Sequence, residues 1–384
     1  MKTMVSNMTH VCLGDVAREI KQKVPAGQEL PTVGLEHLDP GEVELAHWDE
    51  GVETTFTKAF SKGQVLFGRR RAYLRKAAVA PFDGICSGDI TVIAPKDNLS
   101  PRLLPFIIQN DALFEHAVTN SAGSLSPRVK WQNLSQFEFE LPNADKQEEL
   151  ADILWAAQET RSRYKQLLTA CGDVVKSQFV EMFGDEKWDF KPLSECVNSI
   201  DTGKSMNCGE GPQGVGGFGV LKLSALSSGT FVASENKVIS KDNFMSIKEV
   251  EKGDLLFARK NTPELVGTTV YVPNEVKGLM FPDLVFRMKP KDVNALYLLA
   301  YMRSDRGLDL IQGMAHGSAK SMVNIPKTQL ARLPVPVPPL ELQQEFASFV
   351  AQVDKSKFAV QKALDELNAT TKKILNQELG LGDV

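Results

Sequence analysis

The chain has 384 residues, and its 44 Lys and Arg against 48 Asp and Glu give a formal net charge of −4. With 42% apolar and 24% charged residues it has the balance of an ordinary folded protein, which excludes disordered, collagen-like and wholly coiled-coil chains. No apolar run approaches the ~20 residues that cross a bilayer, and residues 1–7 lack the apolar segment of a signal peptide. The five cysteines show no disulfide rhythm, so the sequence predicts a reduced, cytoplasmic protein without a membrane partner.

In chain order, the first predicted elements are short strands and one helix. Apolar runs bounded by Gly, Pro and Asn predict strands at residues 65–67 and 90–93, and a helix is predicted at about residues 101–118. After Leu141 and Pro142, apolar residues recur at steps of three and four, which is typical of a long helix with one buried seam. The seam residues are Leu150, Leu154, Ala157, Tyr164, Leu168, Cys171, Val175 and Met182, and Ile153, Leu167, Val174 and Phe179 are expected to widen the stripe.

The second half of the chain repeats this order. A strand is predicted at residues 268–272, a helix at about residues 294–313, and a second long helix after Pro338 and Pro339. Each long helix has roughly 35–40 residues, which is about 55 Å at ~1.5 Å per residue. The second seam consists of Phe346, Val350, Val353, Val360, Leu364, Leu367 and Ile374.

Short blocks of sequence recur about 190–196 residues apart. The block Gly-Gln-Val-Leu-Phe-Gly-Arg at residues 63–69 returns as Gly-Asp-Leu-Leu-Phe-Ala-Arg at residues 253–259, and the Gly-Ser pair at 123–124 returns at 317–318. A period this long indicates a duplicated module rather than a solenoid repeat. We therefore expect an α+β fold with mixed α/β globules at residues 1–142 and 188–338, each followed by a long helix, at residues 143–187 and 339–384.

The order globule, helix, globule, helix constrains how the two long helices pair. If they pack side by side as a coiled coil, the second runs back toward the first globule, so the pair is antiparallel and the duplication has pseudo-two-fold symmetry. The alternative is two ordinary amphipathic helices buried in separate cores. The matched positions of the two seams favour the antiparallel pair.

The familiar catalytic and metal-binding motifs are incomplete or missing in this sequence. Residues 202–205, Thr-Gly-Lys-Ser, match the end of a phosphate-binding P-loop, but Asn198 stands where that motif needs a glycine. Asp283 and its counterpart Asp89 lack the further acid and lysine of a nuclease, so a structural role at a strand start is predicted. Because H-E-x-x-H, C-x-x-C and G-x-S-x-G are missing, we predict no catalytic residue and no metal ligand, although a stand-alone enzyme of unrecognised type stays open.

Basic clusters recur at equivalent places in the two modules. Arg and Lys beside Asn, Ser and Tyr are residues that neutralise phosphates and contact base edges. A solvated charged face is the usual fate of one such cluster, but recurrence in both modules favours DNA contact. The predicted DNA-binding residues are Arg69, Arg70, Arg71, Tyr73, Arg75, Lys76, Ser124, Arg128 and Lys130 in the first module, and Lys204, Arg259, Lys260, Asn261, Ser318 and Lys320 in the second.

Together these features resemble the DNA-specificity subunit of type I restriction–modification enzymes, over nearly the whole chain. The resemblance is carried by the blocks at 63–69 and 253–259, the Gly-Ser turns, and the boundary Leu-Pro-Val-Pro-Val-Pro-Pro-Leu-Glu-Leu-Gln at 333–343 that runs into a heptad helix. The first boundary, at residues 137–147, departs from this pattern because it has one proline where the second has two in tandem.

The resemblance implies a non-catalytic subunit that binds double-stranded DNA. Its two target-recognition domains would each read one half of a split, asymmetric site, and its paired helices would fix the unread gap. Two modification subunits would dock on those helices and bring S-adenosylmethionine and adenine-N6 methylation, while restriction subunits would add translocation and cleavage. A coiled-coil scaffold that joins protein partners without reading DNA is the alternative.

Overall fold

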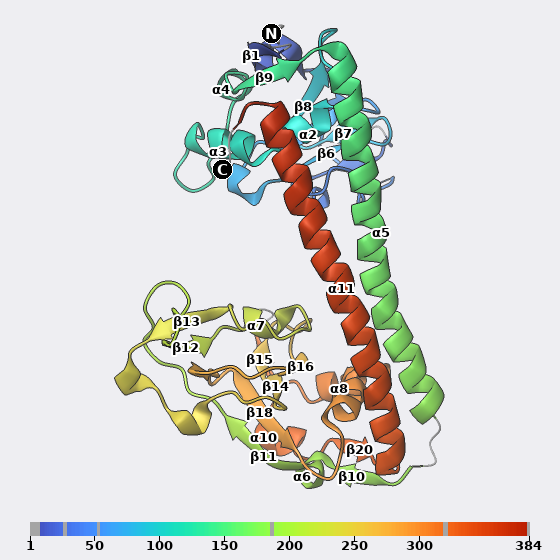
Figure 1. The fold of residues 1–384 in the computed structure, drawn as a ribbon, viewed down its shortest axis with the longest axis vertical. Coiled ribbons are helices and arrows are strands. Elements are labelled where there is room, and N and C mark those ends of the chain that lie inside the picture. Colours follow the sequence, from blue (N-terminus) through green and yellow to red (C-terminus); the bar gives the residue numbers. More distant parts are fainter. Residues whose placement is uncertain (1–7, 26–28, 52–53, 185–187, 318–321, 382–384) are drawn as a thin grey trace, which may run out of the picture. The chain divides into compact units, whose positions relative to one another are not determined.

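The structure is a computed structural model that describes residues 8–25, 29–51, 54–184, 188–317 and 322–381. Its internal contacts divide the chain into two compact units. Unit 1 comprises Met1–Gln166 together with Val360–Val384, and unit 2 comprises Leu167–Ala359 (Figure 1). The last part of the chain therefore folds with the first part.

Unit 1 begins with strands and short helices and leads into the first long helix. Its strands are β1 (Met8–Cys12), β2 (Ala17–Ile20), β3 (Thr32–Val33), β4 (Lys58–Phe60), β5 (Val65–Gly68), β6 (Ala77–Val79), β7 (Gly84–Cys86), β8 (Ile90–Pro95) and β9 (Glu138–Pro142). Its helices are α1 (Leu13–Val16), α2 (Leu104–Ile108), α3 (Asp111–Thr119), α4 (Trp131–Leu134), the first part of α5 (Ala144–Phe183), and the 3₁₀ turns η1 (Leu35–His37) and η2 (Ala72–Leu74).

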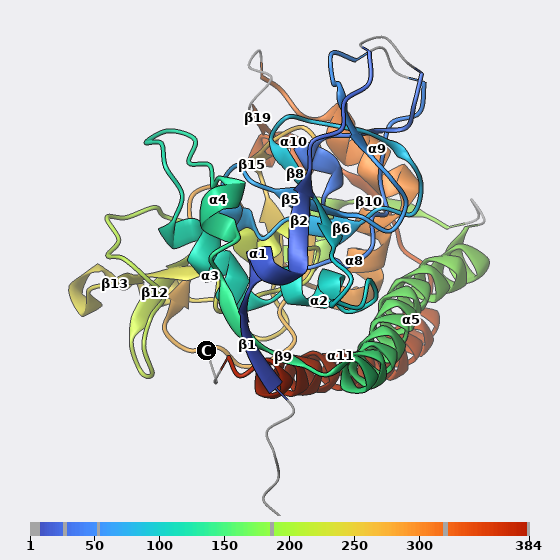
Figure 2. The ribbon, with the colours of Figure 1, turned by 90° about the horizontal axis from the view of Figure 1, so that it is seen from above.

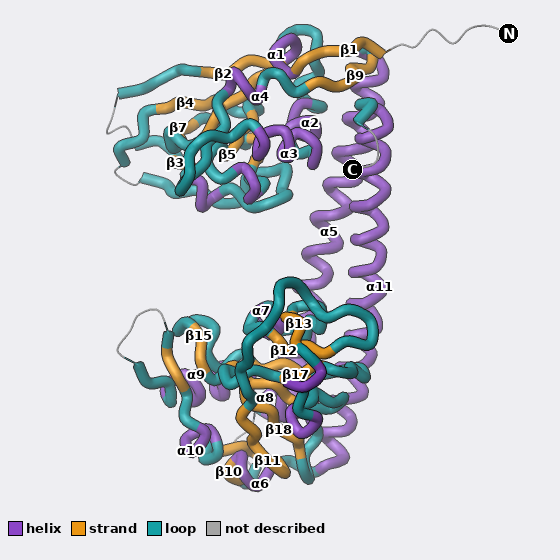
Figure 3. Tube along the Cα trace, turned by 90° about the vertical axis from the view of Figure 1, so that its left-hand side faces the viewer, coloured by secondary structure: helices purple, strands orange, loops and turns teal. Residues whose placement is uncertain are grey.

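The main sheet of unit 1 has the strand order β2-β8-β5-β6, and its neighbouring strands are antiparallel. A second sheet, β3-β7-β4, and the pair β1-β9 complete the strands of this unit (Figure 3). All four residues of β5 are buried, and Val65 lies opposite Ile93 of β8. A strand that is buried on both faces is a continuous apolar run in the sequence. The strands predicted at residues 65–67 and 90–93 are confirmed.

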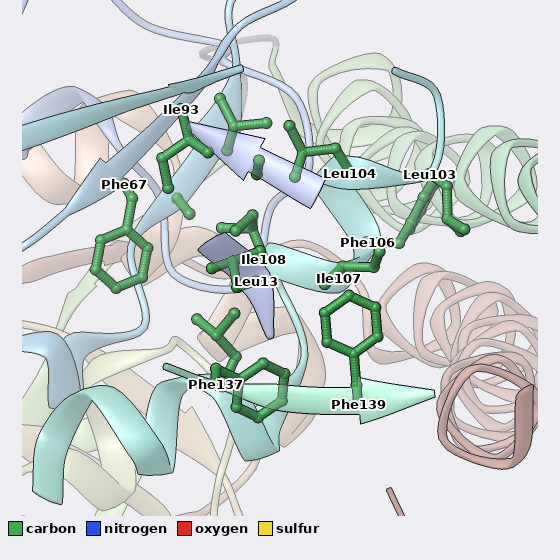
Figure 4. Close-up of a cluster of buried hydrophobic side chains, with 14 of the residues drawn as sticks. Leu13, Phe67, Ile93, Leu103, Leu104, Phe106, Ile107, Ile108, Phe137 and Phe139 are labelled. Carbon is green, nitrogen blue, oxygen red and sulfur yellow. The ribbon is translucent and has the colours of Figure 1, made fainter. Parts of the chain in front are cut away.

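The core of unit 1 combines the main sheet with the helices that pack on it (Figure 4). Phe67 of β5 stacks on Phe114 of α3, with ring centroids 5.5 Å apart. The same cluster contains Leu150 and Leu154 from α5, and Leu379 from the end of the chain. Burial of apolar surface from both ends of the chain thus stabilises one core.

Unit 2 repeats this order of elements. Its strands are β10 (Phe190–Pro192), β11 (Val197–Thr202), β12 (Phe218–Leu221), β13 (Asn236–Ile239), β14 (Leu255–Ala258), β15 (Lys260–Asn261), β16 (Thr269–Tyr271), β17 (Leu279–Met280), β18 (Val285–Pro290), β19 (Val323–Asn324) and β20 (Pro334–Pro336). Its helices are α6 (Leu193–Cys196), α7 (Ser224–Ser227), α8 (Ala295–Arg303), α9 (Asp305–Gly313), α10 (Lys327–Leu330), the first part of α11 (Leu340–Glu378), and the 3₁₀ turns η3 (Lys241–Asn243) and η4 (Ser246–Lys248).

The main sheets of the two units share one strand order. That of unit 2 is β11-β18-β14-β16, in which β14 and β18 hold the places of β5 and β8. The smaller sheets differ. Each contains a parallel pair, β3-β7 or β12-β17, but the third strand joins β7 in unit 1 and β12 in unit 2. The two units thus share the topology of the main sheet and differ in the topology of the smaller sheet.

Each predicted mid-module helix is broken in two, contrary to the prediction of single helices at about 101–118 and 294–313. In unit 1 the Asn110 side chain accepts the Ala112 N–H at 2.8 Å and starts α3. In unit 2 the Ser304 hydroxyl accepts the Gly307 N–H at 3.2 Å and starts α9. Short polar side chains at such positions cap a new helix rather than continue the old one.

The two long helices pack together within each unit, and the contacts show that they are antiparallel. In unit 1 the start of α5 meets the end of α11, where Lys146 pairs with Glu378 at 3.7 Å. In unit 2 the end of α5 meets the start of α11, where the Phe179 and Phe346 rings lie 5.7 Å apart. The predicted antiparallel pairing of the helices is confirmed, and all predicted seam residues are buried or half-buried.

One detail of the seam prediction is wrong. Of the four residues expected to widen the buried stripe, Phe179 is buried, but the side chains of Ile153, Leu167 and Val174 are 43%, 46% and 49% exposed. The facing helix covers a single row of α5 positions at steps of three and four, which is the narrow seam of a coiled coil rather than the broad face of a core helix.

A buried carboxylate distinguishes the start of β14 from that of β5. Asp254 is 2% exposed, and its Oδ2 accepts the Glu251 N–H at 2.8 Å. In unit 1 the neutral amide of Gln64 holds the equivalent turn. Its Oε1 accepts the Ser61 N–H at 2.9 Å. Burial raises the pKa of Asp254 to about 6, against the opposing hydrogen bond and nearby positive charges.

We expect Asp254→Asn to stabilise unit 2 at neutral pH. Because the folded pKa lies above the unfolded value, the stability linked to protonation is fully present below about pH 4 and is lost as the pH rises through about 6. The variant should gain about 2–3 kcal/mol at pH 7, and its stability should vary less between pH 4 and 6. Thermal unfolding across pH measures this, with the exposed Asp242→Asn as control. A variant whose stability falls below wild type at pH 7 would contradict it.

Candidate functional site

The basic residues that follow β5 meet a hairpin loop in unit 1. The Arg71 N–H donates to the Pro127 carbonyl at 2.8 Å, and the Val129 N–H donates to the Arg69 carbonyl at 3.0 Å. Arg70 and Arg128 face each other in an isolated antiparallel bridge. The fold thus brings together basic residues that lie almost 60 positions apart in the sequence.

Asp89, just before β8, holds two of these guanidinium groups. Arg128 donates from Nε to Oδ1 at 2.7 Å and from Nη2 to Oδ2 at 3.2 Å, and Arg70 donates from Nη1 to Oδ2 at 3.5 Å. The hydrogen bond from Arg128 holds the pKa of Asp89 below its usual value. Asp89 therefore orients both arginines and cancels part of their charge. From the sequence alone, only a structural role is predicted for Asp89, so it is missed as a site residue. The signal that could have identified it is its recurrence as Asp283 in the second copy of the repeat.

Two predicted residues of unit 1, Arg75 and Lys76, have side chains that already interact with other groups of the chain. Arg75 forms ion pairs with Asp111 and, at 3.8 Å, with Glu115 of α3. The Lys76 ammonium donates to the Leu35 carbonyl at 2.8 Å. Arg75 is exposed but ion-paired; the other exposed members of the predicted set in this unit, which remain accessible to a ligand, are Arg71, Tyr73, Ser124 and Lys130.

In unit 2 the corresponding arginine has a different partner. Arg259 donates from Nε and Nη2 to the Asn324 amide oxygen at 3.2 and 3.1 Å. Its guanidinium also lies 4.9 Å from the centre of the Phe286 ring. Lys260 is half-buried and pairs with Asn324 in the short β15-β19 ladder. The neutral amide of Asn324 thus stands where Arg128 stands in unit 1, so the two sites differ in charge.

The other predicted residues of unit 2 are spread out. Asn261 is buried and its amide oxygen accepts the Thr262 N–H at 2.9 Å, which leaves it little access to a ligand. Lys204 is exposed, beside Ser205, whose hydroxyl donates to Asp283. Ser318 and Lys320 lie outside the described residues.

In the part of the chain that the structure describes, these basic surfaces are accompanied neither by a cluster of metal ligands nor by a membrane-spanning helix. Among the described residues, no three His, Cys, Asp or Glu side chains gather as the ligands of a metal ion would. Within the same ranges, no helix is both long and apolar enough to cross a bilayer. The arrangement offers guanidinium, ammonium and hydroxyl donors to an anionic ligand.

The sequence profile of the type I restriction modification DNA specificity domain matches residues 6–167 and 185–369. Over 200 residues, the chain is 25% identical to the specificity subunit of the type I restriction enzyme EcoEI from Escherichia coli, an alignment that covers 51% of this chain and 32% of that relative. The chain spans about a third of the length of the curated relatives that it matches.

Two solved structures share the fold. One chain, from a study of complex assembly and conformational transition of the type I R-M system, has a TM-score of 0.54 at 17% identity, covering 98% of this chain and 99% of that one. The S subunit of a type I restriction–modification system from M. genitalium has a TM-score of 0.55 at 12% identity, covering 100% and 99%.

Proposed function

Because the family profile matches more than half of its length, the chain belongs to the type I restriction modification DNA specificity family, and from this premise we propose that it reads the DNA sequence for a type I restriction–modification complex. Its two modules would each recognise one half of a split site. As two different modules in one chain, they suit an asymmetric site, whereas a symmetric dimer suits a palindrome.

One observation carries this proposal: basic residues follow the same strand of the same sheet in both units. Arg69 comes directly after β5, and Arg259 comes directly after β14. In each unit a second segment, with Arg128 or Asn324, lies against it. Guanidinium and amide groups at such a place can contact phosphates and base edges, and their differences between units suit different half-sites.

The finer partners are part of the proposal. Two modification subunits would dock on α5 and α11 and supply S-adenosylmethionine and adenine-N6 methylation, and restriction subunits would supply translocation and cleavage. This chain would contribute no catalytic residue and would act in the cytoplasm. Its target-recognition domains would comprise residues 1–142 and 188–338, with spacer helices at 143–187 and 339–384.

The experiment is methylation of a random DNA library by the full chain co-expressed with a modification subunit. Sequencing of the methylated sites should give a consensus of two short parts separated by a fixed gap. Methylated sites without a two-part consensus would refute the proposal.

The second candidate is a scaffold that joins protein partners through its helices without touching DNA. The exposed apolar side chains of Ile153, Leu167 and Val174 on α5 favour this function. The exposed cations Arg71, Lys130 and Lys204, changed together to Gln, distinguish the two. If each contacts a phosphate, the slope of log affinity against log salt should fall by roughly three for the DNA complex.

The matched control changes Lys62 and Lys252 to Gln. These exposed lysines precede β5 and β14, at the opposite strand ends from Arg69 and Arg259. The control should keep the wild-type salt slope. If the cation variant also keeps it while still binding the modification subunit, the scaffold function is supported instead.

A further inference from the structure

One apolar side chain of unit 1 is almost fully exposed to solvent, on a loop that contacts several arginines. Leu125 is 90% exposed, more than any other large apolar side chain in the described part of this unit. It belongs to the Leu125 loop, residues 122–128, within the connection between α3 and α4 that projects from those helices (Figure 2). Isolated exposed apolar residues are common, so the setting of this one decides whether it has a role.

The Leu125 loop is fixed at its base. Ala122 and Arg128 exchange two backbone hydrogen bonds of 3.0 and 2.9 Å, which close a hairpin around five residues. The Ser126 hydroxyl accepts a hydrogen bond from Arg70 Nη2 at 3.1 Å. With its base held in this way, the loop has no ready path to bury Leu125 in the core, so its apolar surface is available to a partner.

The surroundings indicate the chemistry of that partner. Arg70 and Arg128 lie at the base of the loop, and Arg71 and Lys130 are exposed beside it. The loop that carries this leucine thus has cations at its base and in the residues beside it. Because the cores of protein interfaces are depleted of charged residues, this setting favours an anionic partner over a protein surface. Duplex DNA offers the matching arrangement: phosphates along both edges of a groove and, at its floor, apolar methyl groups of thymine.

We propose that Leu125 is a specificity-determining residue, which contacts a thymine methyl in the major groove of the half-site read by unit 1. The major groove, about 12 Å wide, admits a two-stranded hairpin, whereas the minor groove is about half that width. The cations at the base of the loop would then face the flanking phosphates. This inference rests on the proposed function and adds to it the residue and the base group concerned.

The first experiment repeats the random-library methylation with Leu125→Ala in the full chain together with its modification subunit. The consensus should relax at one thymine position of one half, where discrimination should fall roughly tenfold, while the other half is unchanged. Val118→Ala, another exposed apolar position in unit 1, should leave the whole consensus intact. Because Leu125 is so exposed, its variant should keep the wild-type melting temperature.

The second experiment replaces that thymine by uracil, which lacks only the methyl group. The wild-type complex should bind the uracil duplex roughly fourfold more weakly, whereas the Leu125→Ala complex should bind both duplexes equally. An unchanged consensus, a relaxed position that is not thymine, or an equal loss in both complexes would overturn this inference alone. A wild-type complex without a two-part consensus would instead overturn the proposed function.

Discussion

Changing Leu375 and Leu379 to alanine is expected to lower the unfolding free energy of unit 1 by about 4–10 kcal/mol while unit 2 stays folded. Both side chains belong to the end of the chain and are 7% and 0% exposed. They share one core cluster with Leu150 and Leu154 of α5. Removal of a buried leucine side chain costs about 2–5 kcal/mol, and the sum approaches the whole stability of an ordinary domain.

Hydrogen exchange resolved along the chain measures this effect. Protection should fall in residues 8–166, which form the rest of unit 1, and should persist in residues 188–317 of unit 2. Phe358→Ala is the matched control on the same helix, because Phe358 is 72% exposed and should shift stability by less than about 0.5 kcal/mol. Equal loss of protection in both units would contradict the assignment of the chain end to unit 1.

The duplication and the long helices could be predicted because their signals are local. The apolar run of β5 and its copy in β14 each specify a buried strand without reference to distant residues. The steps of three and four in α5 and α11 likewise need only neighbouring positions. Antiparallel pairing then followed from chain order.

The interactions that the sequence could not predict join distant residues. Asn110 donates to the Asn376 amide at 2.8 Å across 266 positions, and both side chains are buried. Nothing local marks this pair, nor the ion pairs of Asp89 with Arg70 and Arg128. Among the predicted site residues, sequence spacing also could not separate exposed Arg71 from Arg75, whose charge is paired with α3.

A buried glutamine fixes each long helix to its own globule at the repeated boundary. Gln147 Oε1 accepts the Ser100 N–H at 2.8 Å, and its Nε2 donates to the Pro142 carbonyl at 2.9 Å. Gln343 makes the same two bonds, with the Asn294 N–H and the Pro338 carbonyl, both at 2.8 Å. The two residues are 3% and 1% exposed, so water cannot replace these partners.

We therefore expect Gln147→Leu to destabilise unit 1 and Gln343→Leu to destabilise unit 2, each by about 2–5 kcal/mol. Leucine has a similar volume, but it leaves a half-buried N–H and a buried carbonyl without their partner, at about 1–3 kcal/mol for each group. Gln344→Leu, at the exposed neighbouring position, should change stability by less than about 0.5 kcal/mol. Chain-resolved hydrogen exchange should place each loss in the unit that holds the residue. If both variants instead weakened the same unit, these glutamines would not be acting as equivalent attachments of a duplicated module.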